Sequence, residues 1–179
     1  RLRQDPFALE SVHIAIITFD LEVKQVLPLT ALEDLHLPEI GTPESGPTNM
    51  GAALEMLLAK CDAEVRLGTA DAKGDWRPLV FLMTDGKPSD LAVYRATIPQ
   101  VKKRNFACIV ACAAGAQAED SFLKELTDTV VHLDTADSAT LASFFQWVSD
   151  SIGTGNKSVG TVEEITLPDP PNEVHVVNI

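Results

Sequence analysis

The apolar residues of this chain fall into two patterns, short continuous runs and stripes with helical spacing. Four runs are nearly continuous, as in parallel strands buried on both faces, and they span 12–19, 79–83, 106–112 and 130–133. Residues 23–29 alternate more regularly between apolar and polar and contain Pro28, which favours an edge strand. The pattern therefore predicts five strands before residue 134.

Between these runs, apolar residues recur every three or four positions, which is typical of a helix with one buried face. The clearest stripe follows Asn49, and its members are Met50, Ala53, Leu54, Leu57, Leu58 and Cys61. Shorter stripes cover 122–126 and 141–152. After the run at 79–83 we expect Ser89 or Asp90 to cap a further helix, which Pro99 should kink or restart.

Alternation of strands and helices predicts an α/β fold of the doubly wound type, with a mostly parallel sheet and helices on both faces. We assign residues 1–152 to this domain. Residues 153–179 begin as a flexible Gly-containing linker and continue as a Pro-rich tail with a β-prone end. We expect this tail to pack back on the domain or to pair with a sheet edge.

Composition narrows the possible partners. Lys and Arg total 14 against 26 Asp and Glu, and the formal net charge is −12. Phosphate binding needs clustered cations, and the nearest approach to a cluster, 102–104, is better explained as a charged helix end. The sequence thus argues against nucleic acid and anionic membranes as partners. Three scattered cysteines are expected to be reduced, and with no apparent signal peptide we expect a cytoplasmic protein.

Two oxygen-bearing side chains lie where a ligand site is expected. Asp85 directly follows the apolar run 79–83, and Thr48 precedes the helix that begins near Asn49. Ligands of parallel sheets bind outside the carboxyl ends of the strands, and Mg²⁺ prefers oxygen ligands. A structural interpretation remains open at this point: Thr48 can cap the helix, and Asp85 can brace the turn that follows it.

The segments SGPTNMGAALEML and PLVFLMTDGKPSD resemble the von Willebrand factor A domain. Within that superfamily the chain is similar to the bacterial TerY-like branch, which is associated with tellurite resistance. The resemblance implies a metal-ion-dependent adhesion site in which Thr48 binds the metal directly and Asp85 binds it through water. Mg²⁺ is the implied metal, with Mn²⁺ or Ca²⁺ as alternatives.

One part of the family pattern does not occur in this sequence. The family's principal ligands lie in an Asp-x-Ser-x-Ser loop after the first strand, and we expect that segment upstream of Arg1. In the family that strand lies in the middle of the sheet, beside the strands predicted at 12–19 and 79–83. A less favoured alternative is that the tail strand, 173–179, or a neighbouring chain takes its place.

Three functional hypotheses remain. The first is a non-enzymatic module that binds a protein partner through a divalent cation, with the partner offering a carboxylate. The resemblance implies a bacterial tellurite-resistance or stress-response system, whose kinase or phosphatase components are candidate partners. The second is a metal-free scaffold with a degenerate site. The third is a Mg²⁺-dependent phosphohydrolase or phosphoacceptor with Asp85 as the nucleophile.

Overall fold

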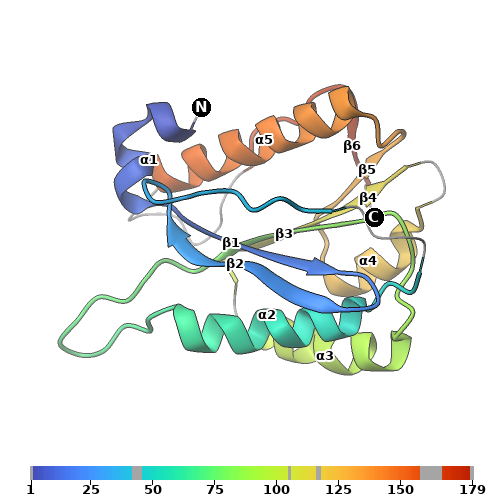
Figure 1. Ribbon diagram of the computed structural model, residues 1–179, viewed down its shortest axis with the longest axis horizontal. Coiled ribbons are helices and arrows are strands. Elements are labelled where there is room, and N and C mark those ends of the chain that lie inside the picture. Colours follow the sequence, from blue (N-terminus) through green and yellow to red (C-terminus); the bar gives the residue numbers. More distant parts are fainter. Residues whose placement is uncertain (1, 42–45, 105, 116–117, 158–166, 178–179) are drawn as a thin grey trace. The chain divides into compact units, whose positions relative to one another are not determined.

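The computed structural model describes residues 2–41, 46–104, 106–115, 118–157 and 167–177 (Figure 1). Contacts along the chain divide it into two compact units, which are described separately. The first unit comprises Arg1–Arg77 and Pro88–Asn105, and the second comprises Pro78–Lys87 and Phe106–Ile179.

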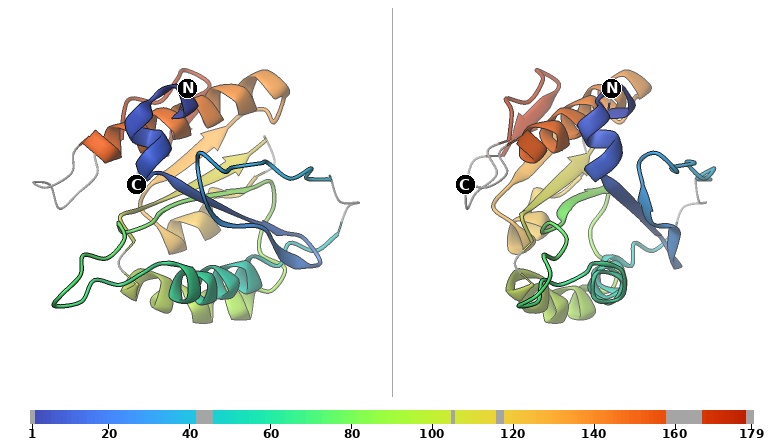
Figure 2. Two further views of the ribbon diagram at one scale, coloured as in Figure 1. Left: turned by 60° about the vertical axis from the view of Figure 1, so that its left-hand side comes forward. Right: turned by 90° about the vertical axis from the view of Figure 1, so that its left-hand side faces the viewer.

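The first unit combines a β-hairpin with two packed helices. Its elements in chain order are η1 (Leu2–Gln4), α1 (Pro6–Ser11), β1 (His13–Phe19), β2 (Val23–Ala31), α2 (Met50–Glu64) and α3 (Leu91–Lys103). α2 contacts both strands and lies beside α3 (Figure 2). Buried apolar side chains hold these elements together, among them Leu27, Met50, Leu54, Tyr94 and Val101. The helix that Pro99 was expected to kink or restart runs as one element through that residue.

Strand β1 differs from the prediction of a parallel strand buried on both faces. It pairs antiparallel with β2, and its first residue, His13, is exposed while most of the others are half-buried. The reason is the connection, because residues 20–22 form a tight turn that reverses the chain. Only antiparallel strands can be joined by so short a link.

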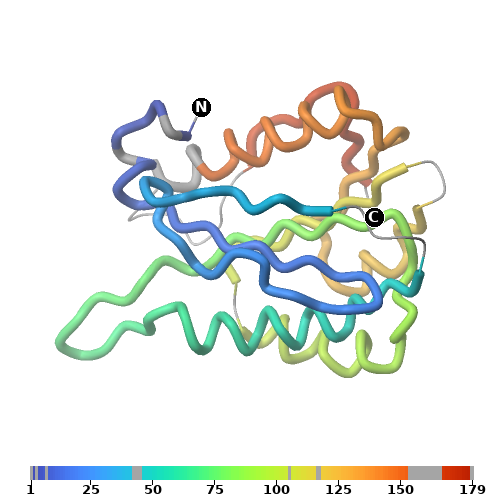
Figure 3. Tube along the Cα trace, viewed as in Figure 1, coloured from blue at the N-terminus to red at the C-terminus, as the bar shows by residue number. Residues whose placement is uncertain are grey.

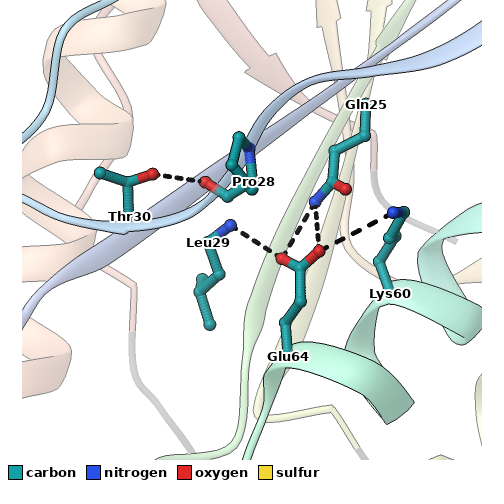
Figure 4. A network of polar contacts seen from close by, with 6 residues as sticks. All are labelled: Gln25, Pro28, Leu29, Thr30, Lys60 and Glu64. Carbon is teal, nitrogen blue, oxygen red and sulfur yellow. Dashed lines mark hydrogen bonds and ion pairs between the residues drawn. The ribbon is translucent and has the colours of Figure 1, made fainter.

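The outer edge of β2 is closed by a carboxylate from α2. Ile14 pairs with Thr30 and Ile16 with Leu27, so β2 carries one extra residue in this interval, a β-bulge. The backbone N–H of Leu29 donates to Glu64 Oε2 at 2.8 Å, and Gln25 Nε2 donates to both Glu64 oxygens (Figure 4). Glu64 therefore supplies the acceptor that a neighbouring strand would otherwise provide.

An ordered hairpin-like loop follows α2 and ends at Arg77 (Figure 3). The Arg66 and Asp75 backbones are linked by a 2.9 Å hydrogen bond, and the Arg66 N–H also donates to the Asp75 carboxylate. This second bond is the main cause that lowers the pKa of Asp75. Trp76 lies at the end of the loop, 52% exposed, with the Lys73 ammonium over its ring.

The second unit is a four-stranded sheet with a helix on each face. Its strands, in the spatial order of the sheet, are β3 (Leu79–Thr84), β4 (Cys108–Ala114), β5 (Val130–Leu133) and β6 (Val174–Val176). β3, β4 and β5 are parallel, whereas β6 is antiparallel to β5. Phe144 and Trp147 of α5 (Ser138–Lys157) pack on one face, and α4 (Asp120–Leu126) contacts β4 and β5 from the other. The α/β fold class with a mostly parallel sheet is thus confirmed.

The C-terminal tail contributes a strand to this sheet. Val174 is buried in the core beneath α5, and Trp147 Nε1 donates to the carbonyl of Pro168 at 2.9 Å. The predicted linker begins too early, because α5 continues to Lys157 and buries Ser151, whose hydroxyl bonds the Trp147 carbonyl. The remainder of that linker, 158–166, lies outside the described residues.

Among the residues described here, the edge strands β1, β2, β3 and β6 each have one edge without a ladder partner, and at β2 that edge is closed by Glu64. β1 pairs with β2 alone, and β3 pairs with β4 alone. The tail strand occupies the open edge of neither β1 nor β3, since β6 pairs with β5. No helix in the described part of the chain is long and apolar enough to cross a bilayer.

Replacing Glu64 with Ala should lower the free energy of unfolding by about 1–3 kcal/mol, because it leaves the Leu29 N–H and the Gln25 amide without their acceptor. Urea denaturation measures the change. Glu55 lies exposed on the same helix, so Glu55→Ala is the matched control and should change stability by less than about 0.5 kcal/mol. Equal effects of the two substitutions would contradict the role assigned to Glu64.

Two valines of β6 provide a test of how firmly the tail is docked. Val174 is 3% exposed and Val176 is 47% exposed. Val174→Ala should destabilise the protein by about 1–2 kcal/mol, at roughly 0.8 kcal/mol per buried methylene equivalent. Val176→Ala removes the same atoms from an exposed position and should have a smaller effect in thermal or urea unfolding. The difference between the two variants measures the contribution of burial at Val174. If both were neutral, the docked tail would contribute nothing to stability.

Candidate metal-binding site

Thr48 has its backbone fully bonded and its hydroxyl free. Its N–H donates to Ser89 Oγ at 2.8 Å, and its carbonyl accepts the N–H groups of Ser89 and Met50, both at 2.9 Å. The half-buried side chain has no hydrogen-bond partner within the described chain. The hydroxyl is therefore the one polar group of Thr48 that remains available to a ligand.

The structure contradicts the interpretation of Thr48 as a helix cap. The N–H groups of Gly51 and Ala52, in the first turn of α2, donate to the two carboxylate oxygens of Asp90 at 2.9 and 2.8 Å. Asp90 and Ser89 were expected to cap α3, but Asp90 makes no side-chain capping bond to its own helix and both side chains bind the α2 segment instead. The reason is that the unpaired N–H groups of α2 lie within reach of that carboxylate.

Asn49, at the start of α2, makes hydrogen bonds to the turn between β1 and β2. Its backbone N–H donates to the Asp20 carbonyl at 3.0 Å, and its Nδ2 donates to the Leu21 carbonyl at 2.9 Å. The turn has its own bond, from the Glu22 N–H to Asp20 Oδ1 at 2.7 Å. The residues next to Thr48 are consequently held from two sides, by this turn and by the segment that starts α3.

Asp85, in the second unit, follows the last residue of β3, as expected from the sequence. The turn after β3 is held by Thr84, whose hydroxyl donates to the Gly86 carbonyl at 3.1 Å and accepts the Gly86 N–H at 3.2 Å. Thr84 thus performs the bracing role that had been the alternative interpretation of Asp85. The Asp85 carboxylate is exposed and has no partner in the part of the chain that the structure describes.

The available donors fit a hard cation in kind. A hydroxyl and a carboxylate are oxygen ligands of the type that Mg²⁺ and Ca²⁺ prefer. The ligand set from the described residues is incomplete, since they contain no cluster of three or more His, Cys, Asp or Glu side chains able to hold a metal ion. Thr48 in the first unit and Asp85 in the second are thus each a candidate ligand that needs further donors, from water or from another segment.

The three thiols are shielded by burial, and the His132 imidazole has a hydrogen-bond partner. Burial raises the pKa of the Cys112 thiol to about 12, so this residue stays protonated at neutral pH. Burial also raises the pKa values of Cys61 and Cys108. His132 Nδ1 bonds Asp120 at 2.9 Å, across the sheet face covered by α4. Among the described residues, none of these three thiols is paired with His132 as nucleophile and base.

Comparison with known families identifies the family of the chain. The sequence model of the von Willebrand factor type A domain matches residues 5–147. The chain belongs to the von Willebrand factor type A family. Domains of this family are in general protein-interaction modules that often depend on a metal, so a protein partner is expected at that level. No curated protein and no solved structure matches the chain significantly.

Sequence reasoning proposed Thr48 and Asp85 as ligands of this von Willebrand factor type A domain, which stays a prediction, but it missed the hydrogen bonds that hold the residues around Thr48. Asn49 was considered only as the start of a helix, and Ser89 and Asp90 only as caps for their own helix. A Ser-Asp pair before a helix does signal a capping role. Nothing in the local sequence indicates that the helix being capped is another one, 38 or 39 residues away.

Gly51 provides a test of the contact between α2 and the start of α3. A methyl group at this position would lie 2.8 Å from the backbone carbon of Val93 and closer still to the backbone nitrogen of Tyr94. Gly→Ala inside a helix normally stabilises by about 1 kcal/mol. Here Gly51→Ala should instead destabilise by about 1–3 kcal/mol because backbone cannot yield as a side chain does. Gly41→Ala, with open space around it, is the control in urea unfolding.

Proposed function

We propose that this domain is a non-enzymatic module that binds a protein partner through a divalent cation. Thr48 would bind the cation directly through its hydroxyl, and Asp85 would bind it through water. The cation is Mg²⁺ in the first instance, with Mn²⁺ and Ca²⁺ as alternatives. When bound with few protein charges around it, such a cation keeps affinity for an external carboxylate, which the partner would supply.

The observation that supports this proposal most directly is the pair of free oxygen groups. Local structural needs are met by other residues, because Asp90 caps α2 and Thr84 braces the turn after β3. The hydroxyl of Thr48 and the carboxylate of Asp85 are left without partners among the described residues. Only Gly86, Lys87 and Pro88 separate Asp85 from Ser89, which holds Thr48.

The remaining ligands are proposed to come from an Asp-x-Ser-x-Ser loop on a strand that precedes this sequence. The open edges of β1 and β3 support this part of the proposal, since these are the two strands expected to flank that first strand. An unpaired backbone group that is buried costs about 1–3 kcal/mol, so an edge of an interior strand calls for a partner.

The enzymatic alternative has less support. A phosphoryl group would need oriented N–H groups or cations near Asp85. Along the chain, Lys87 is the only cation close to Asp85, and the sequence has no P-loop motif. A phospho-aspartate analogue formed with beryllofluoride at Asp85 would favour that alternative.

The biological setting is the least constrained part of the proposal. The segments around Thr48 and Asp85 are similar to the TerY-like branch, which supports a role in a bacterial tellurite-resistance or stress-response system. In that setting we propose kinase or phosphatase components as partners. The acidic chain, with net charge −12, supports a cation-mediated contact over direct attraction of an acidic partner.

The metal part of the proposal can be tested with Mg²⁺ and Mn²⁺ alone, by calorimetric titration of a chain that includes the segment proposed to carry the Asp-x-Ser-x-Ser loop. Thr48→Ala and Asp85→Asn should each weaken binding by at least about 10–100-fold, the range seen when a residue that supports a metal ligand is removed. Neither side chain has a structural partner, so the urea midpoint should stay unchanged.

Matched controls come from exposed positions. Ser121→Ala removes a hydroxyl from α4, and Asp71→Asn removes the same charge from the loop after α2. Both should bind metal as the unsubstituted chain does. Metal binding that is absent, or that survives in Thr48→Ala and Asp85→Asn, would rule out the site and favour the metal-free scaffold.

A further inference from the structure

We infer that Ser89 is a positioning residue for Thr48, holding its backbone so that only its hydroxyl is presented to the cation. This inference rests on the function proposed above. Ser89 itself does not touch the metal. Its contribution is to order the residue that does.

The contact between the two residues is reciprocal. The Thr48 N–H donates to Ser89 Oγ at 2.8 Å, and the Ser89 N–H donates to the Thr48 carbonyl at 2.9 Å. A two-bond ring of this kind fixes the orientation of a peptide group better than a single bond, because rotation about either bond breaks the other. Thr48 is thereby held by a residue 41 positions later in the chain.

The same contacts leave the hydroxyl oxygen as the one group of Thr48 that is free to bind a metal. Its carbonyl accepts from both Ser89 and Met50, so both lone pairs are used. Its N–H is used by Ser89. In flexible loops the backbone carbonyl oxygen is a common metal ligand. A cation approaching Thr48 would instead bind the hydroxyl, because the carbonyl oxygen is already used.

The location of Ser89 indicates that its hydroxyl adds little to the stability of the fold. The residue is exposed, and its side chain makes no capping bond to α3. The structural link between α2 and α3 is made instead by Asp90, through Gly51 and Ala52. Loss of the Ser89 hydroxyl should loosen the Thr48 backbone without releasing α2, and the cation would then have to order that backbone on binding.

The test compares Ser89→Ala with Ser89→Thr. Alanine removes the acceptor, whereas threonine keeps it and should restore the behaviour of the unsubstituted chain. With Mn²⁺ as the probe, Ser89→Ala should bind about 10–100-fold more weakly, as for other residues that orient a ligand. The Thr48 amide should exchange its hydrogen faster in Ser89→Ala, and the urea midpoint should stay the same.

The possible outcomes separate the inference from the function on which it rests. Weakened binding in Thr48→Ala with normal binding in Ser89→Ala would overturn the role of Ser89 and keep the site. Unchanged binding in both variants would overturn the proposed function together with the role of Ser89. A lower urea midpoint in Ser89→Ala that accounts for the lost affinity would assign Ser89 a structural role instead.

Discussion

The two hydrogen bonds from the first turn of α2 to the carboxylate of Asp90 are the interaction on which the candidate site depends. A helix start leaves N–H groups that need acceptors, and here the acceptor comes from the segment that begins α3. The absence of a side chain at Gly51 allows this approach. With α2 capped from outside, Thr48 has no capping role, and its hydroxyl stays free for chemistry.

The edges of the strands are explained in the same way, because their backbone N–H and C=O groups also need hydrogen-bond partners. At β2, Glu64 accepts the Leu29 N–H within the bulged interval, so that edge is closed by a side chain. At β5, the tail supplies β6 as a ladder partner. The described residues provide no such partner for one edge each of β1 and β3.

The chemistry proposed for this von Willebrand factor type A domain is that of oxygen ligands. Its thiols are buried, and the pKa of Cys112, raised to about 12, keeps that sulfur protonated and inert. His132 is committed to Asp120. Against this background a hydroxyl and a carboxylate without partners are the groups most able to act, and they suit a hard cation that an acidic protein attracts.

The sequence by itself determined the element types, the strand-end place of Asp85 and the place of Thr48 before α2, because local periodicity and apolar runs are properties of neighbouring residues. It also indicated that the tail would be β-prone. The antiparallel pairing of β1 follows from the short link at 20–22, although the apolar run alone favoured a parallel strand. The continuation of α5 to Lys157 and the partner of Asp90 were decided by tertiary structure. Each depends on which unpaired backbone group or apolar surface lies nearby once the chain has folded, and spacing along the sequence does not encode that distance.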